Sequence, residues 1–193
     1  MVDYYEDNFD YLKSFYPISR KIYDQLLSIT VFKQIKANTR LVNLGDVPQK
    51  LYLLNKGVSR VVFVSEDGKQ LTKTLFTPID IFASFTALLE QTPSNLIYET
   101  LTPCEIFEID HKAFAKLCHT NIEVLKFYTR FLESLFKVGE IRHLEVASLD
   151  AKQRYLKLRK LIPEIDNLIP QHQIASYLNI TPVQLSRIRA KLY

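Results

Sequence analysis

The period of the hydrophobic pattern changes once along this chain, at about Asp110. From about residue 29 up to that point, short runs of β-branched and aromatic residues recur every eight to twenty residues, which is typical of strands. After it, apolar residues recur at spacings of three and four, which is typical of helices. The chain is therefore expected to be an α+β protein, with an all-β body followed by helices.

Turn-forming residues separate the strand-like runs. Asp67-Gly68 stands between two such runs and is a strong hairpin signal. Gly45 and Gly57 also fall between runs, where a positive φ is needed. This pattern predicts an antiparallel barrel or a double-sheet jelly roll. The expected strands cover residues 31–35, 51–54, 58–64, 71–76 and 105–109.

A long helix is expected to begin after Asn121, following a short helix capped by Asp110. It carries two apolar stripes. We expect one stripe to pack on the β body and the other on a second copy of the chain, which gives a parallel homodimer. The alternative is that both stripes are buried in one monomer. The seam expected to face the partner comprises Leu125, Tyr128, Leu132, Leu135, Gly139, Arg142, Val146 and Leu149, and the second stripe comprises Val124, Phe127, Phe131, Val138 and Ile141. Gly139 is expected to permit close approach of the partner helix.

We divide the chain into residues 1–120 (a β-roll with N-terminal helices), residues 121–147 (the dimerisation helix) and residues 148–193 (a compact helical domain). Within the first of these, residues 4–27 show a weaker helical pattern, broken at Pro17.

The charge is divided unevenly between the body and the C-terminal end. The net charge of +4 resolves into −2 for residues 1–150 and +6 for residues 151–193. A basic end on an otherwise acidic body favours a polyanionic partner such as DNA. The alternative is a solvated basic helix face.

Several function classes are excluded or disfavoured by composition. No apolar run reaches the roughly 18 residues of a membrane span, and the acidic N-terminus lacks the layout of a secretion signal. Two cysteines, Cys104 and Cys118, are too few for a disulfide framework or a four-thiolate metal site. The four glycines match no nucleotide-binding fingerprint, and no catalytic constellation stands out. We therefore expect a cytoplasmic protein, not an enzyme, without membrane, metal or cofactor.

The most specific segment is residues 169–192, which has the features of a helix-turn-helix. Asn179 occupies the tight-turn position, because asparagine tolerates left-handed geometry. Thr181 and Pro182 are the favoured N-cap and first residue of a helix. The inward-facing residues are expected to be Ile174, Ala175, Leu178, Leu185, Ile188 and Leu192.

The outward face of this second helix has cations and amides but no acids, which suits DNA better than a purely structural hairpin. We expect Arg187 to make the main base contact with help from Gln184 and Ser186, and Val183 to meet a thymine methyl. Other contacts, chiefly with phosphates, are expected from Gln171, His172, Thr181, Arg189 and Lys191.

The order of a jelly roll, a long helix and a C-terminal helix-turn-helix resembles the Crp/Fnr family of bacterial transcription regulators. The likeness is most specific from Gln173-Ile174-Ala175 to Leu185-Ser186-Arg187-Ile188. It implies a homodimer that reads a two-fold symmetric site in double-stranded DNA, with RNA polymerase as a further partner.

The resemblance breaks down at the expected sensor pocket. Family members that bind cyclic nucleotides carry Phe-Gly-Glu and a following arginine. The matching positions here are Phe82-Ala83-Ser84 and a position near Ser94 and Asn95, and no basic residue lies between Lys73 and Lys112. The residues expected to stand where the family holds the purine are Gly139 and Glu140. A buried phosphate without a cation is prohibitive, so we expect a degenerate pocket that takes an unknown small-molecule effector or none.

The DNA reader also departs from the family. Pro182 and Val183 replace an arginine and a glutamate that often read bases. The sequence stops at Tyr193, where relatives continue into a β-hairpin wing, so a wingless form or an early end is expected. Two alternatives to an effector-controlled regulator remain: a regulator whose β domain senses nothing, and an effector-binding or protein-interaction module that does not regulate DNA directly.

Overall fold

The order of elements is the expected one: N-terminal helices, then the strands of the roll, then the long helix and the C-terminal helices. A computed structural model describes residues 4–192 of the chain. The helices are α1 (Tyr4–Phe15), α2 (Arg20–Leu27), α3 (Phe85–Glu90), α4 (His111–Thr120), α5 (Ile122–Ser148), α6 (Ala151–Leu161), α7 (Ile165–Leu168), α8 (Gln171–Tyr177) and α9 (Pro182–Ala190). The strands are β1 (Thr30–Ile35), β2 (Arg40–Val42), β3 (Lys50–Lys56), β4 (Ser59–Val64), β5 (Gln70–Phe76), β6 (Ile81–Phe82), β7 (Leu96–Thr100) and β8 (Cys104–Asp110).

The strands form two four-stranded sheets, which confirms the expected double-sheet roll. Sheet A has the order β1-β8-β3-β6 and sheet B the order β2-β7-β4-β5, and all pairs are antiparallel. The five expected strands are present. β2, β6 and β7, and the short helix α3, were not expected from the sequence.

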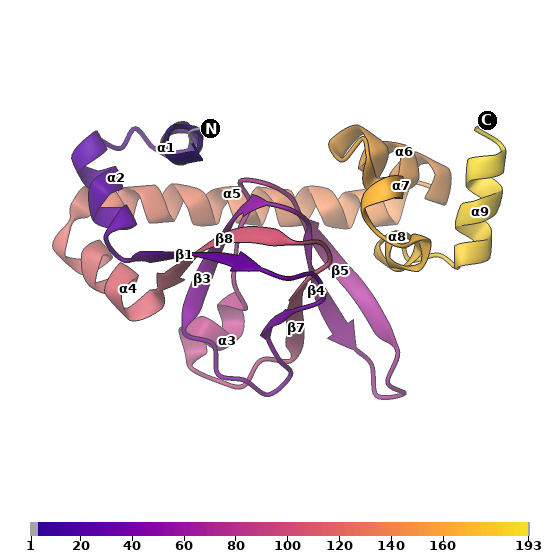
Figure 1. Cartoon of the computed structure of the whole chain (residues 1–193), viewed down its shortest axis with the longest axis horizontal. Coiled ribbons are helices and arrows are strands. Elements are labelled where there is room, and N and C mark those ends of the chain that lie inside the picture. Colours follow the sequence, from indigo (N-terminus) through magenta and orange to yellow (C-terminus); the bar gives the residue numbers. More distant parts are fainter. Residues whose placement is uncertain (1–3, 193) are drawn as a thin grey trace.

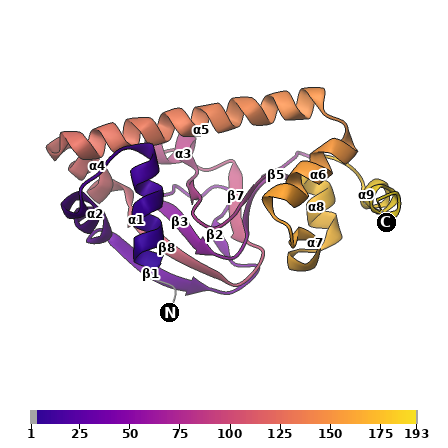
Figure 2. The same cartoon turned by 90° about the horizontal axis from the view of Figure 1, so that it is seen from above.

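The space between the sheets is filled mainly by apolar and aromatic side chains, including Leu54, Val61 and Ile106. Helices α1, α2, α4 and the start of α5 cover the outer face of sheet A, where Leu51 joins their apolar side chains. Figure 2 shows these helices around one end of α5, with the roll lying along the helix. The roll is thus covered at one end by the N-terminal helices.

Helix α5 is the long axis of the molecule. Its 27 residues correspond to about 40 Å at the usual rise of about 1.5 Å per residue. It runs past the whole roll to the C-terminal helices at the other end (Figure 1). Only its first half is buried in the chain, through Val124, Phe127 and Phe131, whereas Val138 and Ile141 of the same expected stripe are 64% and 55% exposed.

The C-terminal helices share a core with the roll. Tyr155, Leu158 and Ile174 cluster with one another and with Val58 and Leu75 of the roll. Sheet B therefore supplies part of the apolar surface on which α6 and α8 are packed.

Gly57 is expected to be the glycine least tolerant of substitution. Its φ is +97°, and a Cβ there would lie 2.5 Å from the carbonyl oxygen of Pro103 and 2.7 Å from Cys104 Sγ. Gly68 has φ +79° but open space around it. Gly57→Ala should therefore lower the free energy of unfolding by about 2 kcal/mol, and Gly68→Ala by about 1 kcal/mol or less. Denaturant titrations of both variants measure this difference, and equal losses would contradict the crowding at Gly57.

Candidate nucleic-acid interface

The helix-turn-helix is built by the local signals that the sequence displays. Asn179 has φ +54°, which confirms the left-handed turn between α8 and α9. The Thr181 hydroxyl accepts a hydrogen bond from the Gln184 backbone N–H, and the Gln184 side chain accepts one from the Thr181 N–H. This capping box, with Pro182 as the first helical residue, fixes the start of α9.

The two helices are held together by a small, fully buried core. Ile174 and Ala175 on α8 and Leu185 on α9 have no exposed surface. Ala175 is small enough to let the second helix cross closely. This arrangement confirms the expected inward faces and fixes which side of α9 remains outside.

The outer side of α9 carries the residues expected to read DNA. At about 100° per residue, Val183, Ser186, Arg187 and Lys191 fall on one side of the helix, opposite Leu185. All four are exposed, and Val183 is 59% exposed. Figure 1 shows α9 at the C-terminal end of the molecule, away from the roll. The face is therefore open to a large partner.

Arg189 is placed differently from the other expected contacts. The helical period puts it on the inner side of α9, where its guanidinium pairs with Asp166 and donates to Tyr155 Oη at 3.2 Å. Tyr155 Oη in turn donates to Asp166 at 2.6 Å. Arg189 thus links α9 to α6 and α7 through its guanidinium. The same guanidinium is less available to contact a phosphate.

The remaining expected contacts lie around the start of α8 and α9. Gln171 Nε2 donates to the Pro182 carbonyl at 2.8 Å, which links the two helix starts. His172 is exposed beside it. The side-chain oxygen of Gln184, Oε1, takes part in the capping box, and so does the hydroxyl of Thr181. Both of these side chains therefore have a structural role as well.

The basic helix α6 is less free than its composition indicates. Arg154 donates to the backbone carbonyls of Leu149 and Leu178 at 2.5 and 3.1 Å. Lys157 pairs with Glu145 of α5 at 2.8 Å. Part of the +6 charge of this end therefore holds the helices together.

Phe82, a residue of the expected sensor pocket, lies among stacked aromatic side chains. The ring of Phe82 stacks on Phe76 and Tyr52, with centroid separations of 4.4 and 5.4 Å. It also lies parallel to Tyr98, at 6.1 Å. Burial raises the pKa of Tyr98 to about 12, against the effect of a hydrogen bond with Ser84, and burial also raises the pKa of Tyr52 to about 12. These phenols therefore stay neutral in an apolar interior.

Ser84 and Ser94 lie side by side within the roll. Their hydroxyls are 2.9 Å apart and hydrogen-bonded, and both residues are buried. Ser94 also donates to the carbonyl of Leu96 at 2.8 Å. Asn95 is exposed, and Gly139 and Glu140 lie on α5, where Glu140 is exposed. The structure thus brings together Phe82, Ser84 and Ser94 of the expected pocket, and the two serines satisfy each other.

The second half of α5 presents an unpartnered apolar surface. Phe136, Leu144 and Val146 are 75%, 62% and 48% exposed. A Cβ at Gly139 would meet no atom within 4 Å. Nothing in the described chain therefore requires glycine at this position, and any close approach there would have to come from another chain.

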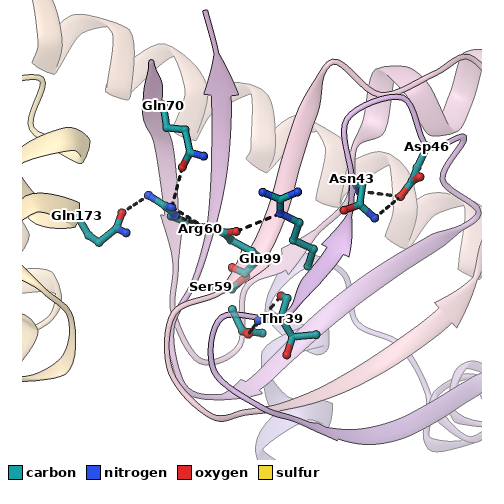
Figure 3. A network of polar contacts seen from close by, with 10 residues as sticks. Thr39, Asn43, Asp46, Ser59, Arg60, Gln70, Glu99 and Gln173 are labelled. Atoms are coloured by element: carbon teal, nitrogen blue, oxygen red, sulfur yellow. Dashed lines mark hydrogen bonds and ion pairs between the residues drawn. The ribbon is translucent and has the colours of Figure 1, made fainter. Parts of the chain in front are cut away.

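Sequence reasoning missed a buried arginine between the roll and α8. Arg60 on β4 is only 5% exposed and pairs with Glu99 on β7, directly opposite it, at 2.5 Å. Figure 3 shows its guanidinium reaching Gln173 on α8. The only available signal was a lone arginine inside a β-branched run, which does not reveal its partners.

Comparisons with known proteins match this architecture. The family model of the cyclic nucleotide-binding domain matches residues 32–121. The cAMP-activated global transcriptional regulator CRP of Pasteurella multocida is 30% identical over 89 residues, 46% of this chain and 43% of that protein. The same regulator of Haemophilus influenzae is 26% identical over 133 residues, 69% of this chain and 59% of that protein. The chain thus spans less than two thirds of either relative.

A solved structure with a similar fold is that of CLP, described as a global regulator responsive to c-di-GMP in Xanthomonas campestris. It superposes with a TM-score of 0.66 at 15% identity, over 90% of this chain and 91% of that one. Within residues 4–192, no helix is both long and apolar enough to cross a membrane. The same part of the chain places no three His, Cys, Asp or Glu side chains where they could hold a metal ion.

Proposed function

We propose that the chain is a DNA-binding transcription regulator of the Crp/Fnr type that acts as a homodimer. The observation that carries this proposal is the exposed, acid-free face of α9, held on a buried helix-turn-helix core. Such a helix fits the major groove, where side chains reach base edges. Under this proposal residues 1–120, 121–147 and 148–193 serve as sensor-like roll, dimer helix and DNA-reading domain.

Each side chain of the α9 face has a chemical role in this proposal. Arg187 donates two hydrogen bonds to a guanine edge, Gln184 and Ser186 assist it, and Val183 meets a thymine methyl. Gln171, His172, Thr181 and Lys191 are assigned to phosphate contacts, which would fix the register of the domain on DNA. Arg189 contributes indirectly, by holding α9 on Asp166 and Tyr155.

The expected seam of α5 supports the homodimer. Leu125 and Val146 of that seam are exposed in the single chain, and a second α5 packed along the seam would bury them. Two recognition helices related by a two-fold axis would then read half-sites about 34 Å apart.

The roll is proposed not to bind cyclic nucleotides in the way of its cAMP-activated relatives. The phenyl ring of Phe82 lies within an aromatic stack, Ser84 and Ser94 are hydrogen-bonded to each other, and the sequence has no lysine or arginine between Lys73 and Lys112. Isothermal titration calorimetry with cyclic AMP and cyclic GMP should give no heat of binding at micromolar concentration. Micromolar affinity for either nucleotide would overturn this part of the proposal.

The test of DNA binding is selection of bound sequences from a random duplex pool with the purified protein. A two-fold symmetric consensus is expected. Binding to unselected duplex DNA should also weaken with salt, with a slope of about −0.9 per phosphate contact in a plot of log affinity against log salt. No enrichment and no salt slope would instead favour an effector-binding or protein-interaction module that does not read DNA.

Arg187→Ala should weaken binding to the selected sequence by about 1 to 3 kcal/mol and relax the preference at one base pair. The loss arises because a base edge is left without its donor. Arg130 on α5 is 60% exposed and pairs with Glu133, far from α9 in sequence and on another helix, so Arg130→Ala is the matched control. Fluorescence anisotropy with labelled duplex measures both variants. Unchanged discrimination in Arg187→Ala would refute the assigned role.

A further inference from the structure

Sheet B and α8 are joined by a buried polar contact, formed by Arg60, Glu99 and Thr72 of the roll with Gln173 and Ser176 of α8. We call these five residues the sheet–helix contact (Figure 3 shows Arg60, Glu99 and Gln173). The residues of the roll and the residues of α8 that they contact are more than 100 positions apart in the sequence. Nothing in the proposed reading of DNA by α9 uses them.

Arg60 is the centre of the contact. Its Nε donates to Glu99 Oε1 at 2.7 Å and its Nη2 donates to the same oxygen at 2.5 Å. Its Nη1 donates to Thr72 Oγ1 at 3.0 Å and to Gln173 Oε1. A further bond from Nη2 to Gln70 Oε1 at 3.4 Å completes the five N–H groups of the guanidinium. The sheet residues therefore fix the orientation of the Arg60 guanidinium. Gln173 accepts a hydrogen bond from this fixed group.

Ser176 makes the second link. Its Oγ accepts a hydrogen bond from the Thr72 backbone N–H at 2.9 Å. β5 is the edge strand of sheet B, so this N–H has no neighbouring strand on that side. The α8 hydroxyl thus occupies a place at the sheet edge.

Helix α8 also contacts α5, through Tyr177 and Arg142. Arg142 Nη2 donates to the Tyr177 carbonyl at 3.1 Å, and its guanidinium lies 4.1 Å from the Tyr177 ring centroid. The helix is thereby fixed between the roll and the dimer helix. The reading face of α9 is not covered, since Val183, Ser186 and Arg187 are exposed.

We propose that Arg60, through Gln173, is a positioning residue that sets where α9 stands relative to the dimer helix. This inference rests on the proposed function. In a dimer, the separation of two recognition helices decides which spacing of half-sites fits, and that spacing is about one turn of DNA. If the C-terminal domain is fixed to the roll, the two recognition helices keep one separation. If the domain is loosened, several separations become accessible and the dimer is less preorganised for any one of them.

The test uses the full chain with Gln173→Ala and Ser176→Ala together, which removes both acceptors on α8 and keeps Arg60 with its sheet partners. Gln173→Glu is the conservative variant, because a carboxylate oxygen still accepts from Arg60. Arg40→Ala is the control: Arg40 also approaches Glu99, at 3.8 Å, but it is 49% exposed and has no bond to α8.

The first readout needs no DNA. Hydrogen exchange at the Thr72 amide and along α8 should become about tenfold faster in the double variant and stay unchanged in Arg40→Ala. Gln173→Glu should keep the wild-type protection of α8. Unchanged exchange in the double variant would overturn the proposal, whatever the protein does with DNA.

The second readout is selection from a random duplex pool. Wild type should recover half-sites at one dominant spacing, and the double variant should recover the same half-site sequence over a broader range of spacings. A dominant spacing that stays unchanged in the double variant overturns the positioning role. Failure of the wild type to select any sequence would instead refute the proposed function. The hydrogen-exchange result would still show whether the sheet–helix contact holds α8 on the roll.

Discussion

Replacing Leu185 with alanine should lower the free energy of unfolding by about 3 kcal/mol, within the usual range of about 2 to 5 kcal/mol for a buried leucine. Leu185 has no exposed surface and belongs to the cluster that contains Tyr155, Ile174 and Ala175. Its removal leaves a cavity at the point where α9 rests on α8. The loss is expected to be large because the neighbouring elements are held by caps and ion pairs and cannot close around the gap.

Denaturant titration followed by circular dichroism measures this loss. Leu156 on α6 is 43% exposed, so Leu156→Ala is the matched control and should cost less than about 1 kcal/mol. The Leu185 variant should also lose protection from proteolysis in α8 and α9 before the roll does. Equal losses in the two variants would mean that Leu185 is not part of a tightly packed core.

The helix-turn-helix could be predicted residue by residue because its signals are local. The turn at Asn179, the cap at Thr181 and the inward leucines depend on neighbours within a few positions, and the structure confirms each of them. The cap at Asp110 is confirmed for the same reason. Local preference and tertiary packing agree in these segments.

Three strands escaped prediction because their stability is not local. β6 has two residues and β2 has three, too few to show a period. β7 is longer, but it lies between β2 and β4 and is held by hydrogen bonds to both. Strands of this kind depend on pairing partners that are distant in the sequence.

The position of the candidate site could be predicted from the sequence. Which of its charged side chains are exposed and which form ion pairs within the chain could not. Arg187 and Arg189 look equivalent in the sequence, yet one is exposed and the other pairs with Asp166. Arg60 gave no sign of its partner Gln173, which lies 113 positions away. The identity of an arginine's partner is set by tertiary packing, and only the direction of a helical face follows from the period.

Replacing Leu125 and Val146 with aspartate should raise the dissociation constant of the proposed dimer at least about 100-fold, or about 2.7 kcal/mol. Both residues belong to the seam expected to face a second α5, and they are 41% and 48% exposed in the single chain. In the monomer the new carboxylates would be hydrated. In the dimer they would be buried without partners, and the cost of removing charge from water would fall on association alone.

Ile141 and Leu144 provide a control on the same helix. They are 55% and 62% exposed, but the helical period places them roughly 100° to 160° round from the seam. Ile141→Asp with Leu144→Asp adds the same charge to the same helix and should leave the dimer intact. Sedimentation equilibrium over a range of concentrations compares both double variants with wild type.

The outcomes separate the possible arrangements of α5. A dimer lost only in the Leu125/Val146 variant supports the seam, and one lost only in the control variant places the interface on the other exposed face. A wild type that stays monomeric at every concentration refutes the homodimer. Where the seam variant is monomeric, it should still bind an isolated half-site but lose about 100-fold or more on a paired site, because two linked recognition helices bind as one unit. Unchanged affinity for the paired site would show that DNA is read by single chains.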